Sequence, residues 1–246
     1  MKRILFLGIA LMASFVLQET AGGTENRKEA ADGPRAEKYY YEATSVKHQT
    51  PQKNFVEMEF TLGEAGIEYH SRSISSGSSE EIFIQMDKEA RFVSGIRRTR
   101  RSPDKAVHQD KIWRDRDKVV VERHSEGGRK RRDLRLPPDE GLAVDGSLLA
   151  LLRLFPFDEG RKWNLFMVDF SGYSITVSVF QDGRERIAVP AGEFECYRMV
   201  TVVNIPVFKP KITFWISTQK PHFMVKHRGR SGPFTPFYTT SLMAIE

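Results

Sequence analysis

The sequence predicts a mainly β protein: a strongly curved antiparallel sheet or open half-barrel with one buried central helix. From Trp163 to the C-terminus, runs of alternating apolar and polar residues follow one another, separated by short turns. One segment alone, Leu148–Phe155, has apolar residues at helical spacing. A dozen or so strands with a single helix are typical of a sheet that curves around its own core.

The first 23 residues have the pattern of a secretory signal peptide. Lys2 and Arg3 precede an apolar run from Ile4 to Leu17, and small residues follow at 21–23. A permanent membrane anchor is the weaker interpretation, because this run is shorter than the roughly 20 residues that a membrane-spanning helix needs. We expect export to the periplasm and a soluble protein after cleavage.

The rest of the chain divides into a short lead-in and one domain. Residues 24–38 are rich in charged and small residues, include Pro34 and lack apolar periodicity, which predicts a flexible segment. Residues 39–246 carry the strand patterns and are expected to form a single β-rich domain, which we expect to be a monomer. The one cysteine, Cys196, allows no intramolecular disulfide and is interpreted as a buried apolar residue.

The chain is basic, with a formal net charge of +6. For an exported protein this charge favours attraction to anionic lipid headgroups, phosphorylated glycans or cell-wall polymers. Nucleic acid is not expected as a partner, because the signal peptide places the protein outside the cytoplasm.

The N-terminal half of the domain predicts a β-meander. Strands are expected at Tyr39–Tyr41, at 55–60 and at 67–74, with a turn at 63–66 between the second and the third. After a polar loop at 75–79, two further strands are expected at 82–85 and 92–96.

Two basic clusters follow, and we expect them close together on adjacent strand ends. The second cluster belongs to a predicted hairpin of residues 118–124 and 129–136, closed at 126–128. Charged side chains on exposed hairpins can simply keep a sheet edge from pairing with other molecules. The alternative is an anion-docking surface, in which guanidinium groups bind phosphates or carboxylates. Its candidate residues are Arg97, Arg98, Arg100, Arg101, Arg129, Lys130, Arg131 and Arg132.

The predicted helix contains Leu148, Leu151, Leu152 and Phe155 at i, i+3, i+4 and i+7. Asp145 or Ser147 is expected to cap it, and Pro156 to end it. Leu149 and Leu154 widen the apolar stripe, so the helix is expected to be buried on the concave side of the sheet.

Strands fill the rest of the chain. Residues 163–170 are apolar on both faces, whereas 175–179 alternate as in a sheet with one solvent-exposed face. Hairpin turns are expected at 181–183 and at 190–192. The remaining strands are expected at 187–189, 194–203, 212–217, 223–225 and 238–245.

An apolar helix against a curved sheet is a place where a ligand cavity can open. The residues predicted to line it are Leu148, Leu151, Leu152, Phe155, Trp163, Phe214 and Trp215. The expected ligand is lipid-like, such as an acyl chain.

Several short motifs resemble those of bacterial exported proteins grouped as domain of unknown function 3108. They are Asp145, Leu152-Arg153, Pro156-Phe157, Gly160, Val189–Phe194, Cys196-Tyr197, Phe214–Ser217 and Val225-Lys226. The resemblance covers residues 39 to the end. It implies a periplasmic or envelope protein with a curved antiparallel sheet, similar in shape to lipoprotein-carrier folds that hold acyl chains, and it brings no catalytic residues.

No motif for catalysis or for a metal or other cofactor is found. The histidines form no ligand pair at a metal-binding spacing, and Glu193 with Glu195 is the least poor candidate for a catalytic carboxylate pair. The sequence therefore favours a non-enzymatic binding or carrier module for an apolar ligand. The alternative is an envelope scaffold that docks an anionic partner through its arginine clusters.

Overall fold

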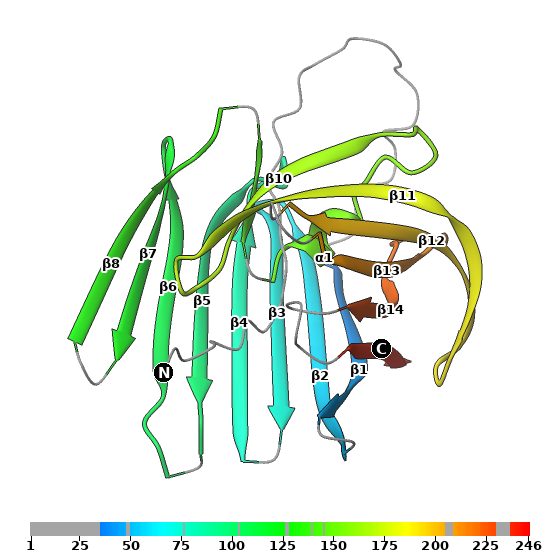
Figure 1. The fold of residues 1–246 in the computed structure, drawn as a ribbon, viewed down its shortest axis with the longest axis horizontal. Helices are drawn as coiled ribbons and strands as arrows, with labels where there is room; N and C mark the ends of the chain where they lie inside the picture. The colour runs from blue at the N-terminus through cyan, green and yellow to red at the C-terminus, as the bar shows by residue number, and fades with distance from the viewer. Residues whose placement is uncertain are drawn as a thin grey trace.

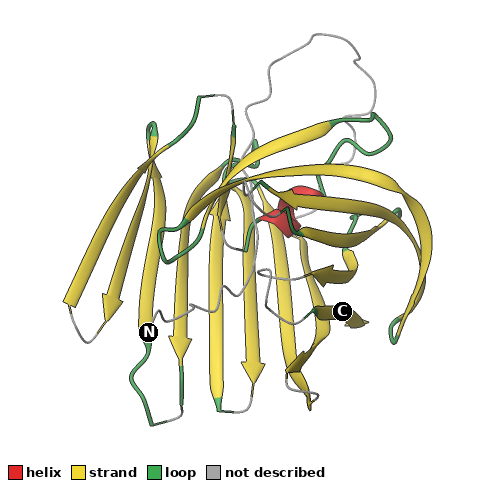
Figure 2. Cartoon of the chain, in the orientation of Figure 1, coloured by secondary structure: helices red, strands yellow, loops and turns green. Residues whose placement is uncertain are grey.

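The computed structural model describes residues 35–47, 50–75, 77–102, 104–125, 128–138, 140–144, 146–204, 209–229 and 237–246. They form fifteen strands and one short helix (Figure 2). The strands are β1 (Arg35–Lys47), β2 (Thr50–Gly63), β3 (Gly66–Ser75), β4 (Ser78–Met86), β5 (Phe92–Arg100), β6 (His108–Asp115), β7 (Lys118–Ser125), β8 (Gly128–Arg135), β9 (Gly141–Val144), β10 (Lys162–Val168), β11 (Ser174–Val189), β12 (Gly192–Val203), β13 (Lys211–Ser217), β14 (Met224–Gly229) and β15 (Tyr238–Ile245). The helix is α1 (Leu148–Leu152). The predicted signal peptide, most of the lead-in and Asp145 lie outside the described residues.

All the strands belong to one open sheet. Their order is β8-β7-β6-β5-β4-β3-β2-β1-β15-β14-β13-β12-β11-β10-β9, so β8 and β9 are the two edges. Every pairing is antiparallel except that of β9 with β10. Figure 1 shows β1–β8 as a broad array, while β10–β12 arch across it. The predicted mainly β class and open sheet are confirmed, and the sheet is not closed into a barrel.

The arch brings the two halves of the sheet together over one core. Alternation along the strands sends every second side chain inward. Phe60, Tyr69 and Ile84 from the first half belong to the same buried cluster as Leu165 and Met199 from the second. We call the face that contributes to this core the inner face, and the opposite one the outer face.

The helix is shorter than the sequence predicts. The backbone N–H groups of Leu154 and Phe155 bond to carbonyls three residues back, at 2.9 and 3.3 Å, which tightens and ends the helix. Pro156 also disfavours a helical conformation at Phe155. Leu154 is 52% exposed, and Ser147 makes no side-chain capping bond. A buried helical turn therefore stands where the sequence predicts a central helix.

Two other strands were missed from the sequence, and one predicted turn is wrong. The strands β6 and β9 were not predicted, since β6 reads His-Gln-Asp-Lys-Ile-Trp-Arg-Asp and β9 is only four residues long. The turn predicted at 181–183 lies inside β11, where the register with β12 shifts between Gln181 and Arg184. Gly183, the residue that suggested a turn, therefore lies in a β-bulge within the strand. The predicted turns at 63–66 and 190–192 are confirmed.

Arg153, directly after α1, joins the helical turn to both halves of the sheet. Its Nε donates to the carbonyl oxygen of Pro221 at 2.9 Å, and its Nη2 pairs with Glu37 of β1. The guanidinium lies 4.5 Å from the centre of the Phe60 ring. Only 12% of the Arg153 side chain is exposed. This cation therefore holds the helical segment in the hollow of the sheet.

We expect Arg153→Met to lower the free energy of unfolding by about 3 kcal/mol. The substitution keeps an apolar side chain but leaves the largely buried Glu37 carboxylate and Pro221 carbonyl without their hydrogen-bond donor. Urea unfolding measures the loss. The matched control is Arg161→Met, which breaks an exposed pair with Glu159 and should cost under about 0.5 kcal/mol. Equal losses in the two variants would contradict the anchoring role.

Candidate functional site

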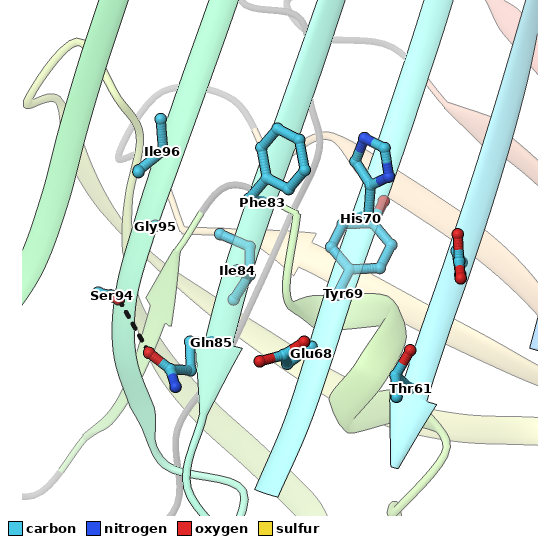
Figure 3. A pocket seen from close by; sticks show the side chains of 11 residues that line it. Thr61, Glu68, Tyr69, His70, Phe83, Ile84, Gln85, Ser94, Gly95 and Ile96 are labelled. Carbon is cyan, nitrogen blue, oxygen red and sulfur yellow. Dashed lines mark hydrogen bonds between the residues drawn. The ribbon is translucent and has the colours of Figure 1, made fainter. Parts of the chain in front are cut away.

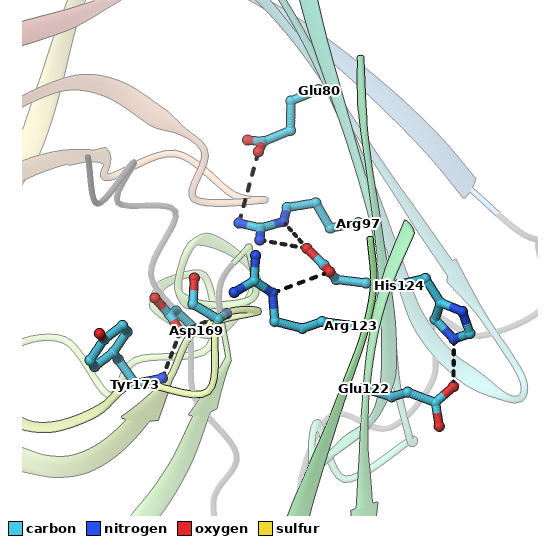
Figure 4. A network of polar contacts seen from close by, with 9 residues as sticks. Glu80, Arg97, Glu122, Arg123, His124, Asp169 and Tyr173 are labelled. Atoms are coloured by element: carbon cyan, nitrogen blue, oxygen red, sulfur yellow. Dashed lines mark hydrogen bonds and ion pairs between the residues drawn. The ribbon is translucent and has the colours of Figure 1, made fainter. Parts of the chain in front are cut away.

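A polar network lies at the inner-face end of β5, β6 and β7 (Figure 4). The register aligns Arg97 with Asp110 and Asp110 with Arg123 on three neighbouring strands. Arg97 donates to Asp110 at 3.2 and 2.7 Å, and Arg123 donates to the same carboxylate at 3.4 Å. Arg97 also lies 4.0 Å from Glu80, whose pKa is raised by burial. Asp110 and Arg97 are largely buried in this network, whereas Arg123 and Glu80 reach the solvent, so it forms the boundary of the core at this end.

The two basic clusters do not lie on adjacent strands, so that prediction is wrong. Their strands, β5 and β8, are separated by β6 and β7. The register nevertheless places Arg98 and Arg129 in one row on the outer face, with Gln109 and His124 between them. At the usual spacing between strands, the backbones of the two arginines are roughly 14 Å apart.

Most arginines of the β8 cluster have partners. Arg129 pairs with Glu122, and bonds from His124 and Arg129 lower the pKa of that carboxyl. Arg131 bonds to Asp133 at 2.9 Å and lies over the Trp113 ring at 5.8 Å. The remaining members of the two clusters lie as follows: Arg132 packs beside Gly172, whereas Lys130 and Arg101 are exposed.

Arg98 and Arg100 line a hollow on the outer face, with a volume of about 220 Å³. We call it the arginine hollow. Its other lining residues are Arg72, Ser79, Glu81 and Val107. The guanidinium of Arg98 lies 5.2 Å from the centre of the Phe83 ring, and Arg72 Nε is 3.7 Å from Glu81 Oε1. Sequence reasoning identified Arg98 and Arg100 here but missed Arg72, which stands alone in its strand.

A larger hollow of about 410 Å³ lies beside it on strands β2–β5 (Figure 3). Its apolar part includes Phe83, Ile84 and Ile96, and its acidic part includes Glu59 and Glu68. The rings of His70 and Phe83 stack at 4.2 Å, and Ser94 donates to Gln85 at 3.5 Å. No residue predicted to line a lipid cavity contributes to either hollow.

Six of the predicted cavity residues are packed into the core. They are Leu148, Leu151, Leu152, Phe155, Trp163 and Phe214. Trp215 lies on the outer face instead, because it alternates with Phe214 along β13; its Nε1 donates to Glu185 at 2.7 Å. The hypothesis that these residues bind a lipid-like ligand stays a prediction.

Three buried groups on β12 and β14 bear on reactivity. Thr201 Oγ1 and His227 Nε2 have no hydrogen-bond partner among the described residues. His227 stacks on Phe214 at 4.6 Å, and burial lowers the pKa of His227 to about 4. Burial raises the pKa of the Cys196 thiol to about 12, so it is not a nucleophile at neutral pH.

In the described part of the chain, no group of three or more His, Cys, Asp or Glu side chains could hold a metal ion. No helix there is both long enough and apolar enough to cross a membrane.

The comparison with protein families tests the predicted resemblance to domain of unknown function 3108. The model of the family described as "Protein of unknown function (DUF3108)" matches residues 67–232. The chain belongs to this family. The match spans β3 to β14 and so covers the whole arginine hollow, the larger hollow except for its β2 residues, and most of the core of this DUF3108 protein.

Among solved structures, one similar chain is described as a "putative lipoprotein" from Parabacteroides distasonis ATCC 8503. It is 10% identical, with a TM-score of 0.32, and the similarity covers 88% of this chain and 100% of that one. None of the curated proteins matches this DUF3108 chain. The function must therefore be argued from its own residues.

The buried side chain of His227 makes the stability of the folded protein depend on pH. Its pKa is about 4 when folded and near 6.5 when unfolded, so the unfolded chain binds more protons between these values. Stability is therefore full above about pH 6.5 and falls as the pH falls toward 4. We expect His227→Phe, which keeps the ring stack, to remove about 2.5 kcal/mol of the loss between pH 7 and pH 4.5.

Urea unfolding at both pH values, with NMR titration of the ring, measures this effect. His124→Gln, at an exposed histidine, is the control. It should lose as much unfolding free energy between pH 7 and pH 4.5 through His227 as the wild type does. An unchanged pH dependence in His227→Phe would show that this ring titrates normally.

Proposed function

We propose that this protein is an exported, non-enzymatic interaction module of the cell envelope that docks an anionic component through the outer face of β5–β8. The observation that carries the proposal is the charge of that face. By the register of the strands, it presents the carboxylates Asp115, Glu122 and Asp133, and a larger set of cations: Arg98, Arg100, Lys111, Lys118, Arg129, Arg131 and Arg135.

Protection of the sheet edge accounts for only part of this charge. β8 is an edge strand, and its arginines and lysine would discourage pairing with another chain. β5, however, is an interior strand with partners on both sides. Arg98 and Arg100 therefore protect no edge, and binding of an anion is the better explanation for them.

The proposed location and oligomeric state rest on similar arguments. The pattern of residues 1–23 supports export to the periplasm, where anionic lipids and polymers are the abundant partners. We propose a soluble monomer, because pairing two β8 edges would bring like charges face to face. No catalytic group is part of the proposal.

A carrier of an apolar ligand is the second candidate function. The observation that favours it is the pair of unpartnered polar atoms on the inner face, Thr201 Oγ1 and His227 Nε2. Buried polar groups usually have a hydrogen-bond partner, and the head group of a bound fatty acid would supply one. The packed side chains of the inner face would have to separate to admit an acyl chain.

Docking predicts charge-specific binding to anionic vesicles. We expect the mature protein to bind phosphatidylglycerol–phosphatidylcholine vesicles, and Arg129, Arg131 and Arg135→Ser together to weaken binding on the order of 100-fold, at ~1 kcal/mol per cation. The control replaces Arg161, Arg186 and Arg198 by Ser, an equal charge change in the other half of the sheet. Vesicle sedimentation at low and high salt measures the binding of both triple variants. Equal losses of binding in the two variants, or wild-type binding that does not change with salt, would refute docking through the outer face of β5–β8.

The carrier function predicts stabilisation by a lipid. If the inner face admits an acyl chain, oleate should raise the Tm of delipidated protein. Thr201→Val and His227→Phe should reduce that rise, since they remove the atoms that would bind the carboxylate. An unchanged Tm at saturating oleate would end this candidate.

A further inference from the structure

We propose that the arginine hollow binds a phosphoryl group, and so is the specific contact of this protein with its anionic partner. This inference rests on the docking function proposed above and names the chemistry that the site recognises. Its basis is the convergence of three guanidinium groups and a hydroxyl on one hollow of about 220 Å³.

The sheet register creates this convergence from residues that are distant in the sequence. Arg72 of β3 is the partner of Glu81 on β4, and Glu81 is the partner of Arg98 on β5. Arg100 is two residues beyond Arg98 and therefore lies on the same face, where its partner is Ser79. Five positions on three strands thus direct polar side chains into the hollow.

The charges of the hollow are not balanced. Glu81 is its one carboxylate among the described lining residues, and it lies 3.7 Å from Arg72. Arg98 has the Phe83 ring beneath it, which orients the guanidinium without accepting a conventional hydrogen bond. Neither Arg98 nor Arg100 pairs with a carboxylate of the described chain. The hollow therefore keeps an excess of positive charge and of N–H donors.

These donors fit a phosphoryl group better than other ligands. Guanidinium forks bind phosphate oxygens through paired hydrogen bonds, and several forks can share one tetrahedral group. The hydroxyl of Ser79 can donate a further bond. The volume of the hollow is several times the ~30 Å³ of a water molecule, which leaves room for a phosphate. Val107 alone among the lining residues is apolar, so an acyl chain has little to contact.

The test compares two sources of the same group. Calorimetric titration of the mature protein uses inorganic phosphate in one arm and phosphatidylcholine vesicles containing phosphatidic acid in the other. Arg98→Gln with Arg100→Gln removes two donors of the hollow, and the matched control Arg129→Gln with Arg131→Gln makes the same charge change outside it. We expect the first double variant to lose at least about tenfold in phosphate affinity, and the control to lose less than about twofold.

A third variant has the opposite expected effect and does not depend on loss of binding. Glu81→Gln removes the negative charge from the hollow and should tighten phosphate binding roughly fivefold. All substitutions lie on the outer face, and the thermal unfolding of each variant confirms that it is folded.

The outcomes separate this inference from the docking function. If the wild type and Arg98→Gln/Arg100→Gln bind anionic vesicles equally well, the arginine hollow is not the binding site, although the proposed docking function stands. Phosphate binding that depends on the hollow, without any vesicle binding, would support the site for a soluble phosphate and overturn docking. Failure of the wild type to bind either probe would overturn both.

Discussion

The structure depends on the pairing of its first and last strands. Every other pair of neighbours in the sheet is consecutive in the chain, whereas β1 and β15 come from opposite ends. Lys38 and Glu246 exchange backbone hydrogen bonds at 3.1 and 2.9 Å, and Tyr41 donates to the carbonyl oxygen of Met224 at 2.9 Å. Without these bonds, β1–β8 and β9–β15 would be separate meanders, each with an uncovered apolar face. This closure also spans the largest sequence separation in the sheet, so it carries the largest loop-closure entropy cost.

Strands that alternate cleanly could be predicted from the sequence, and those whose side chains pair by charge could not. β11 alternates from Ser174 to Val179 and was found, although its bulge was mistaken for a turn. β6 was missed because its inward Asp110 is held by arginines from both neighbouring strands, a compensation that periodicity does not reveal. With β6 missed, the two basic clusters were expected closer together than they are. The arginine hollow could be predicted only in part, since Arg72 joins Arg98 through register and not through spacing.

The two faces of the sheet have different roles. The inner face is filled by its own side chains, from the leucines of α1 to Phe214, so its apolar residues mainly provide stability. The outer face carries both hollows, and Arg98 and Arg100 in the arginine hollow pair with no carboxylate of the described chain. An apolar helical segment predicted a cavity, but the same pattern is equally typical of a segment that plugs the core. The docking proposal accordingly rests on the polar positions that alternate with the core residues.

Charge on the outer face is also unevenly distributed, and this restricts how an anionic partner can approach. Glu57, Glu59 and Glu68 make the β2–β3 side acidic, and Lys38 lies 3.5 and 3.7 Å from the first two. The β5–β8 side is basic, and the arginine hollow lies where the two regions meet. The basic side attracts an anion and the acidic side repels it. An extended anionic partner would therefore bind in the orientation that keeps its charge over β5–β8 and away from β2–β3. If the hollow binds a phosphoryl group as proposed, Glu81 would weaken that binding and would also repel an anionic partner that lies across the boundary.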